Sequence, residues 1–213
     1  MIDKKEQEQK TYFFDKAKIN KSLEVLVKLL QEKESASKVN IVVFDGRSGA
    51  GKTTIATFLA NILKTKVIHM DDFFLPPAIR TKERLNETGG NIHYERFLKD
   101  ILPKIRKKEA FSYLKYDCLT KSFTVKREIP SSKWRIVEGA YSTHPLFEKY
   151  YDLKVFCDIS PKEQIRRIIL RNGQEKAKEF AEKWIPMEEK YIKEFKIRED
   201  VDLIFTSLKE KVK

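Results

Sequence analysis

Cysteine is scarce in this chain of 213 residues, and long apolar runs are absent. Its two cysteines, Cys118 and Cys157, belong to no CxxC pair, which argues against a zinc site or a disulfide framework. No segment approaches the run of about eighteen apolar residues that a membrane-spanning helix needs, so no membrane partner is expected. The opening residues MIDKKEQEQK also lack the apolar stretch of a signal peptide. Together these absences predict a reducing, cytoplasmic location.

Acidic residues are in the minority, because 44 lysines and arginines stand against 32 aspartates and glutamates, for a net charge of +12. Much of the excess lies between residues 99 and 135, where eleven basic and four acidic side chains leave a charge of +7. Such a surface suits an anionic partner, for example nucleic acid, a membrane or a phosphorylated ligand. The alternative is an ordinary solvated surface. With 41% hydrophobic residues the chain is expected to fold, and its length fits one α/β domain.

Short apolar runs alternate with helical patterns from residue 39 onward. The runs predict five strands, at 39–44, 67–70, 135–137, 153–159 and 201–205. Helices are predicted at 19–30, 53–63, 94–107, 161–171 and 175–195, and a hairpin or another extended excursion at 111–128. Strands that alternate with helices predict an α/β fold, in which a five-stranded, mostly parallel sheet carries helices on both faces.

The strongest motif is GRSGAGKT at 46–53, which fits G-x-x-x-x-G-K-[ST] between a predicted strand and a predicted helix. Its glycines let main-chain N–H groups approach a polyphosphate, and the helix N-terminus adds a favourable dipole. We expect Lys52 to neutralise the β- and γ-phosphates of ATP and Thr53 to offer a hydroxyl to Mg²⁺. The expected nucleotide-binding residues are Gly46, Ser48, Gly49, Ala50, Gly51, Lys52, Thr53 and Thr54. The motif predicts a P-loop NTPase fold, but by itself it does not separate kinases from GTPases or motors.

Acidic residues follow two of the predicted strands, at the sheet edge where ligands bind in open parallel sheets. Asp71 and Asp72 come after the second strand. Because adjacent residues of an extended chain point in opposite directions, one of the two is expected to face the phosphates and to accept the proton of an attacking hydroxyl. Glu138 follows the strand at 135–137 and is expected to hold Mg²⁺ together with Thr53. The alternatives are that the aspartates cap a turn and that Glu138 faces solvent.

Three arginines, Arg166, Arg167 and Arg171, lie on the helix predicted at 161–171. Arg167 and Arg171 are four residues apart and therefore share a helical face. We expect them to close over a transferring phosphoryl group and stabilise its charge. The alternative is that this helix is an exposed basic surface helix.

In their order and spacing these motifs resemble the uridine kinase family, within the group that includes phosphoribulokinase and bacterial pantothenate kinase. The matching segments are GRSGAGKT at 46–53, MDDFF at 70–74, YDC at 116–118, VEGAY at 137–141 and RRIILRN at 166–172. The resemblance implies that Asp71 is the catalytic base, since it matches the aspartate of the family's D-S-F-Y sequence. Asp72 and Phe74 replace its serine and tyrosine. Lys121 stands at the histidine of the family's Y-D-F-V-x-H stretch.

The resemblance implies an ATP-dependent kinase that uses Mg²⁺ and phosphorylates a hydroxyl of a uridine- or cytidine-like nucleoside or a similar small molecule. Asp71, Lys52, Arg167 and Arg171 are the expected catalytic residues. The expected acceptor contacts are Asp71, Phe74, His93, Tyr116 and Lys121. Two alternatives stay open. One is a kinase for a nucleotide or a nucleic-acid end, which the basic stretch would favour, and the other is a non-catalytic ATP-binding module.

The resemblance spans about residues 39–205, which suggests a division of the chain. Residues 1–38 are expected to form an N-terminal helical extension, and residues 39–213 a P-loop kinase domain. Within that domain we expect an acceptor-side insertion at about 75–130 and a lid at about 161–178. The sequence leaves the oligomeric state open, a homo-oligomer included.

Overall fold

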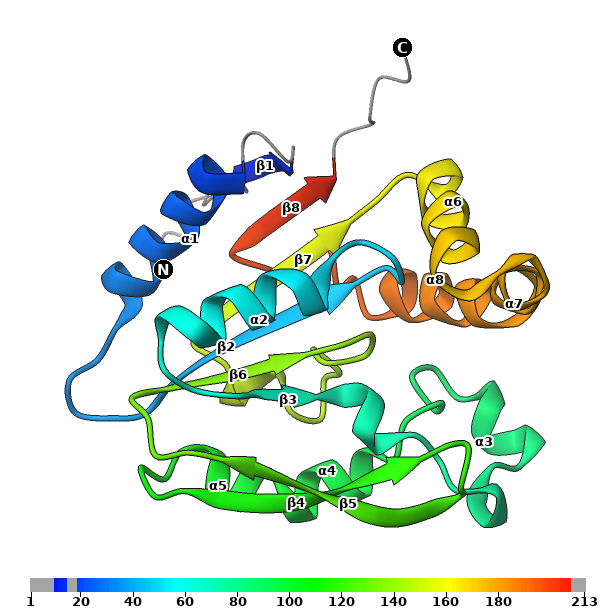
Figure 1. The fold of residues 1–213 in the computed structure, drawn as a ribbon, viewed down its shortest axis with the longest axis horizontal. Coiled ribbons are helices and arrows are strands. Elements are labelled where there is room, and N and C mark those ends of the chain that lie inside the picture. The colour runs from blue at the N-terminus through cyan, green and yellow to red at the C-terminus, as the bar shows by residue number, and fades with distance from the viewer. Residues whose placement is uncertain (1–9, 15–18, 208–213) are drawn as a thin grey trace, which may run out of the picture.

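The computed structural model describes residues 10–14 and 19–207, which form a parallel sheet, helices on both of its faces and a separate hairpin (Figure 1). The strands of the sheet are β1 (Lys10–Phe14), β2 (Asn40–Gly46), β3 (Val67–His69), β6 (Trp134–Glu138), β7 (Leu153–Asp158) and β8 (Leu203–Ser207). Their order is β1-β8-β7-β2-β6-β3, and every neighbouring pair is parallel. The five predicted strands are confirmed, and β1 is a sixth strand that the apolar pattern did not predict.

β2 lies inside the sheet and is buried along its whole length. Because side chains alternate along a strand, Val42 and Phe44 face one apolar core and Ile41 and Val43 face the other. The helices that pack into the first core are α1 (Ile19–Lys33) and α2 (Lys52–Ile62). The helices that pack into the second are α4 (Tyr94–Asp100), α5 (Leu102–Ile105) and α8 (Ile185–Glu194). The predicted cover on both faces is therefore present.

Prolines interrupt two of the predicted helices. The helix expected at 94–107 is divided into α4 and α5, with Pro103 in the first turn of α5. The helix expected at 175–195 consists of α7 (Gln174–Glu179), a π-helical turn η4 (Phe180–Trp184) and α8, with Pro186 in the first turn of α8. A proline lacks the N–H that an α-helix needs at an interior position, and its ring clashes with the preceding turn. The helix expected at 161–171 is α6 (Pro161–Asn172).

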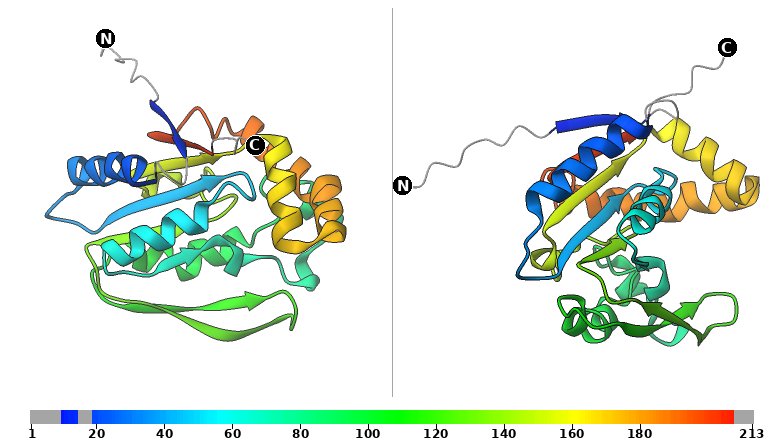
Figure 2. Two further views of the ribbon diagram at one scale, coloured as in Figure 1. Left: turned by 45° about the horizontal axis from the view of Figure 1, so that its top comes forward. Right: turned by 60° about the vertical axis from the view of Figure 1, so that its left-hand side comes forward.

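A hairpin of β4 (Phe111–Asp117) and β5 (Ser122–Ile129) forms a second, two-stranded sheet. It lies at the end of the molecule opposite β1 (Figure 2). The fully buried guanidinium of Arg135 on β6 donates hydrogen bonds to the carbonyls of Lys107 at 2.8 Å and Glu109 at 2.9 Å. Because a buried charge needs such partners, these bonds fix the segment before β4 to the main sheet.

The segment between β3 and α4 contains three short helical turns, η1 (Met70–Phe73), η2 (Pro77–Ile79) and α3 (Lys82–Asn86). A further turn, η3 (Glu148–Tyr150), precedes β7. Within residues 10–14 and 19–207, none of the helices has the length and apolar character needed to cross a bilayer.

Candidate active site

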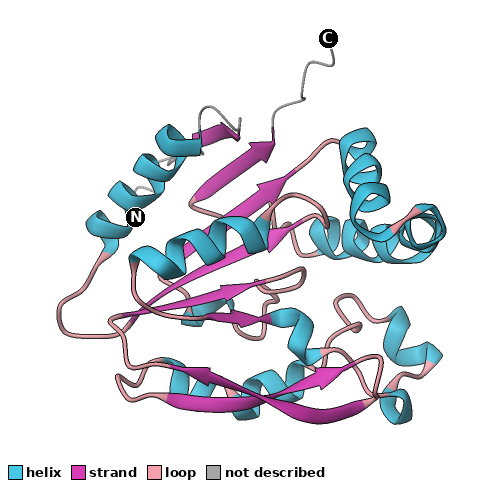
Figure 3. Cartoon of the chain, in the orientation of Figure 1, coloured by secondary structure: helices cyan, strands magenta, loops and turns pink. Residues whose placement is uncertain are grey.

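A cavity of about 950 Å³ lies beyond the carboxyl ends of β2, β3 and β6. Figure 3 shows the loops that leave these strand ends on the side of the sheet where α6, α7 and α8 lie. The predicted site residues that line the cavity are Ser48, Gly49, Gly51, Lys52, Thr53, Thr54, Asp71, Phe74, Glu138, Arg167 and Arg171. Ligand sites of open parallel sheets lie at this edge. The fold thus gathers residues that are more than 100 positions apart in the sequence around one space.

The loop between β2 and α2 has the backbone that its glycines permit. Gly46, Gly49 and Gly51 have φ values of 126°, 79° and 95°. A Cβ at Gly46 would lie 2.1 Å from the carbonyl oxygen of Cys157, so only glycine fits there. The Lys52 ammonium donates hydrogen bonds to the carbonyls of Gly46 at 2.8 Å and Arg47 at 3.0 Å. This places a cation inside a loop whose helix begins at Lys52, an arrangement suited to an anionic phosphate chain.

Thr53 and Glu138 meet because β2 and β6 are neighbours and Glu138 pairs with Phe44 in register. The Thr53 hydroxyl donates to Glu138 Oε2 at 3.1 Å. The other oxygen of Glu138, Oε1, lies 2.6 Å from Nδ1 of His69 on β3. The Glu138 carboxylate, at the end of β6, is therefore held by His69 of β3 and by Thr53 in the first turn of α2.

These two side chains fit Mg²⁺, which prefers hard oxygen ligands and usually takes only one or two from protein. Among the described residues there is no group of three or more His, Cys, Asp or Glu side chains that could hold a metal ion without help. A hydroxyl and a carboxylate beside a phosphate loop match a metal whose remaining ligands are phosphate oxygens and water.

Asp71 and Asp72 lie in the turn η1, and this turn sends them to different surroundings. Asp71 lines the cavity and is exposed to it. Asp72 is buried, and its Oδ2 accepts hydrogen bonds from the Tyr113 hydroxyl at 2.8 Å and from Arg127 Nε at 3.2 Å. Asp72 therefore anchors the hairpin, and Asp71 is the one of the two aspartates that faces the cavity.

The pKa of Asp71 is raised above the usual aspartate value. The main cause is that the protein around the cavity withdraws the carboxylate from bulk water, although the residue keeps an accessible surface. The negative charge of Glu138 adds to the rise, while Lys52 opposes it. A carboxylate with a raised pKa is a better proton acceptor than an ordinary surface aspartate.

The helix α6 carries Arg167 and Arg171 into the cavity lining, as their shared face predicts. Arg167 Nη1 donates to the carbonyl of Gly49 at 3.2 Å, and its Nε donates to Glu163 Oε1 at 2.8 Å. Arg166 makes a two-pronged contact with the same Glu163, at 2.7 Å on each side. Hydrogen bonds from Arg166, then from Arg167, lower the pKa of Glu163 to about 2. Glu163 thus fixes the arginine that touches the phosphate loop.

Two adjacent acids at the start of α8 also hold the phosphate loop. Glu188 Oε2 accepts the Ser48 main-chain N–H at 3.0 Å, and its Oε1 accepts the Ser48 hydroxyl. Glu189 receives two hydrogen bonds from Arg47, Nε to Oε1 at 2.5 Å and Nη2 to Oε2 at 2.9 Å. Burial raises the pKa of Glu188, although Lys52 and Ser48 act against the rise. No motif indicated these residues, because they lie about 140 positions after the loop.

Three expected acceptor contacts do not line the cavity. Tyr116 is buried within the hairpin, with its ring centroid 5.1 Å from that of Phe123. Lys121 is exposed in the turn between β4 and β5, with a φ of 53°. His93 caps α4, where Nδ1 accepts the Arg96 N–H at 3.3 Å. Their roles in acceptor binding stay predictions, and Gly46 and Ala50 belong to the loop without lining the cavity.

Other residues that line the cavity were not predicted as site residues from the sequence. They are Arg80, Asn91, Cys118, Leu119, Gly139, Ala140, Tyr141, Asn172, Lys176, Glu179, Phe180, Trp184 and Glu188. The nearest sequence signals were the YDC and VEGAY segments, which contain or adjoin several of them. The hairpin therefore reaches the cavity with its turn, at Cys118 and Leu119, and not with Tyr116.

Known proteins resemble this chain in sequence and in fold. No protein-family model matches the chain. Uridine-cytidine kinase C of Dictyostelium discoideum is 30% identical to it over 146 residues, which cover 66% of this chain and 32% of that protein. The chain thus spans about a third of the length of this curated relative.

Solved structures show the fold. A protein from Bacillus stearothermophilus described as a possible uridine kinase superposes with a TM-score of 0.63 at 21% identity, covering 88% of this chain and 99% of that one. A protein from Silicibacter sp. TM1040, described as a candidate fructose transport system kinase, gives a TM-score of 0.65 at 18% identity over 85% and 98% of the two chains.

The sheet, the phosphate loop and the position of the cavity define a protein with the P-loop kinase fold. Within that class, the sequence match to a uridine-cytidine kinase agrees with the resemblance predicted from the motifs.

Proposed function

We propose that the chain is an ATP-dependent kinase that transfers the γ-phosphoryl group to a hydroxyl of a uridine- or cytidine-like nucleoside or a similar small molecule. The observation that carries this proposal is that Asp71 lines the same cavity as the phosphate loop and the Thr53–Glu138 pair. A phosphate chain and an acceptor hydroxyl can meet there without any rearrangement of the sheet. The cytoplasmic location expected from the sequence belongs to the same proposal.

The phosphate loop has the role of binding the triphosphate. Main-chain N–H groups of residues 49–53 and the Lys52 ammonium would hold the phosphates in place of the loop carbonyls that Lys52 now contacts. Thr53 and Glu138 would hold Mg²⁺, which when bound neutralises phosphate charge and aligns the transferred group. Positioning and charge stabilisation supply most of the rate gain in such reactions.

Asp71 would orient the acceptor hydroxyl and remove its proton. Its raised pKa favours this step, since the carboxylate is a stronger base than a fully solvated one. Arg167 and Arg171 would lie over the transferred group from α6, and Arg167 already contacts the phosphate loop at Gly49. The developing negative charge would thus face two guanidinium groups.

The lining of the cavity combines aromatic and polar side chains. Phe74 and Trp184 offer apolar ring surfaces, and Arg80 is a polar member of the lining; Tyr141 and Asn91 also line the cavity but are almost fully buried. Such a lining suits a ring-containing molecule with polar edges. It supports a nucleoside-like acceptor, with the change from tyrosine to Phe74 removing one hydroxyl relative to the family pattern.

The test is ADP release from ATP over a panel of nucleosides, nucleotides, pantothenate and sugar phosphates. We expect a nucleoside or comparable alcohol to stimulate release many-fold above the ATPase background. If only nucleotides or nucleic-acid ends stimulate release, with affinity that falls steeply with salt, the acceptor assignment is replaced by the polyanion alternative. ATP binding without stimulation by any acceptor would favour a non-catalytic module.

A further inference from the structure

A second cavity, of about 430 Å³, lies between α2, β3 and β5. The residues that line it differ from those that line the candidate active site. Polar and basic side chains enter it from three directions: Thr57 and Asn61 from α2, Lys66 and His69 from the turn and strand that follow, and Lys126 and Arg127 from β5. This volume lies within the range of small-molecule sites.

Charge in this second cavity is predominantly positive. Lys66, Lys126 and Arg127 line it, against the single acid Glu128. The Lys126 ammonium and Glu128 Oε1 are 3.8 Å apart, and both side chains are more than 60% exposed. A pair so long and so exposed is weak, so Glu128 leaves most of the Lys126 charge available to a ligand.

Stabilisation of the fold explains only part of this basic lining. Arg127 neutralises the buried Asp72, whereas Lys66 lies four residues beyond the end of α2, where the helix dipole has little effect. Lys126 does not neutralise a buried acid either, yet it lines the same concave surface. Thr57 and Asn61 are four residues apart on α2 and present donors on one helical face, which suit phosphate oxygens or sugar hydroxyls.

We propose that this second cavity binds a small phosphorylated molecule carrying a diphosphate group. Phosphate oxygens accept hydrogen bonds from Lys66, Lys126 and the accessible part of the Arg127 guanidinium. The adenosine triphosphate of the proposed reaction occupies the phosphate loop instead, so the second cavity is a separate site.

The second cavity adjoins the candidate active site through two contacts. Arg127 lines it and donates to Asp72, the residue next to Asp71. His69 lines it and contacts Glu138 at 2.6 Å. A phosphate that binds Arg127 competes with Asp72 for the same guanidinium. Binding of the ligand would therefore change the contacts of the turn that carries Asp71.

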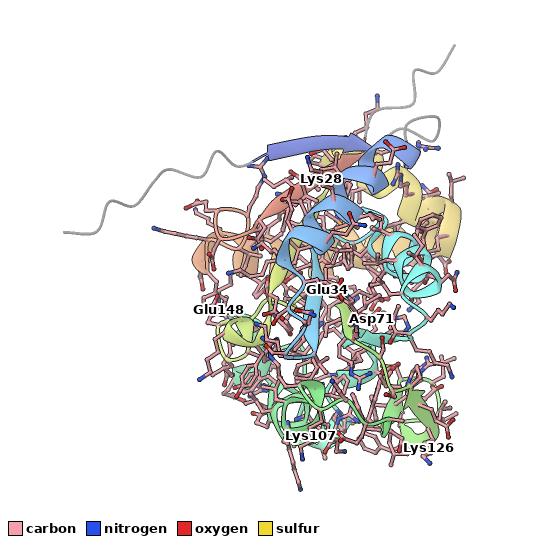
Figure 4. The ribbon with its side chains drawn as sticks, turned by 90° about the vertical axis from the view of Figure 1, so that its left-hand side faces the viewer. Lys28, Glu34, Asp71, Lys107, Lys126 and Glu148 are labelled. Atoms are coloured by element: carbon pink, nitrogen blue, oxygen red, sulfur yellow. The ribbon has the colours of Figure 1, made fainter. Side chains whose placement is uncertain are left out.

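The experiment is a calorimetric titration of the full chain with inorganic pyrophosphate, after the phosphate loop has been filled with a non-hydrolysable ATP analogue and excess magnesium. We expect one further binding event in the native chain. The double variant Lys66→Gln/Lys126→Gln should weaken it roughly tenfold or more, because two charge-assisted contacts are lost. The matched control is Lys107→Gln/Lys108→Gln, which removes the same charge from exposed residues outside the cavity and should bind pyrophosphate as the native chain does. Figure 4 marks Lys107 and Lys126 at separate points on the lower edge of the molecule.

Two results would overturn the proposal: no binding of millimolar pyrophosphate to the native chain, or equal binding by the native chain and the Lys66→Gln/Lys126→Gln variant. A nucleoside diphosphate in place of pyrophosphate should also bind, and should lose affinity in the same variant. Tighter binding of a short single-stranded oligonucleotide than of either probe, lost in that variant, would replace the small molecule by a nucleic-acid backbone. Circular dichroism and the thermal midpoint check that each variant is folded. A failure of acceptor-dependent ADP release leaves this titration unaffected, so the two proposals fail separately.

Discussion

At the scale of single residues, neighbouring side chains of the same type have different surroundings. Asp71 faces a cavity and Asp72 is buried against Tyr113 and Arg127, because η1 is a helical turn instead of a continued strand. The sequence placed a carboxylate at the strand end but left open which aspartate faces the cavity. That choice depends on a hairpin that begins about 40 residues later and supplies the partners of Asp72.

The pKa of Asp71 gives a prediction for the pH dependence of turnover. Its pKa is raised in the folded protein, so the carboxylate is ionised, and able to accept a proton, only above that raised value. We expect kcat to fall on the acid side with a midpoint above the ordinary aspartate pKa of about 3.9. Steady-state rates from pH 4 to 8, with ATP binding measured in parallel as the control, check this. An acid limb centred at or below about 3.9 would contradict it.

Glu163 gives a second pH prediction, on stability. Its pKa of about 2 in the folded protein is lower than its usual value, so its ion pairs stabilise the fold above pH about 4.5 and are lost as the pH falls toward 2. In Glu163→Gln this part of the acid dependence should be missing, and the free energy of unfolding at pH 7 should drop by about 0.2–1 kcal/mol per lost pair. Urea unfolding of both proteins from pH 3 to 7 measures the difference. The idea fails if the two curves stay parallel over that range.

At the scale of elements, two glycines with a positive φ differ in how well they tolerate a side chain: Gly46 in the phosphate loop and Gly173 at the end of α6. An alanine at Gly46 combines a φ of 126° with a Cβ 2.1 Å from the Cys157 carbonyl oxygen, whereas Gly173 has a φ of 85° and nothing within 4 Å of such a Cβ. We expect Gly173→Ala to cost about 1–3 kcal/mol of backbone strain and Gly46→Ala to cost more and to abolish ATP binding. Thermal unfolding of the two variants measures the loss of stability, and calorimetry measures the loss of ATP binding. Equal losses of stability in the two variants would contradict this prediction, because they would mean that the chain relieves the overlap at Gly46.

The start of α8 gives another prediction at this scale. In Glu188→Ala the Ser48 N–H and hydroxyl lose their acceptor, which should destabilise the fold by about 1–3 kcal/mol and raise KM for ATP. Glu188→Gln keeps a carbonyl oxygen for one of these donors and should recover part of the loss. Urea unfolding and ATP kinetics on both variants measure the effect. If the two variants behave alike, the hydrogen bonds to Ser48 are not what holds the loop.

Several elements could be predicted because their signals are local. The apolar runs gave five strands, and GRSGAGKT gave the loop and the start of α2. β1 could not be predicted in this way, because KTYFF is a short polar-to-aromatic run and the strand that it pairs with, β8, lies about 190 residues later. The contacts of Glu188 and Glu189 with the loop are equally remote. The positions of Tyr116 and Lys121 depend on the register of the hairpin, which shifts between Lys115 and Asp117.

At the scale of the whole molecule, the sheet acts as a frame that brings distant loops to one edge. β2, β3 and β6 end beside one another, so the phosphate loop, Asp71 and Glu138 meet although they span about 90 residues. The net charge of +12 is consistent with phosphorylated ligands at two places, the loop and the second cavity. The division into residues 1–38, an insertion at about 75–130 and a lid at about 161–178 stays a proposal.

The most direct test of the central claim compares Asp71→Asn with the native chain and with Asp200→Asn, a control at an exposed aspartate outside the cavity. Each protein is assayed for acceptor-dependent ADP release and titrated with Mg·ATP by calorimetry. The account predicts that Asp71→Asn binds ATP with native affinity while its turnover falls by about 10²–10⁴, and that Asp200→Asn is unchanged in both. Near-native turnover in Asp71→Asn would contradict the account.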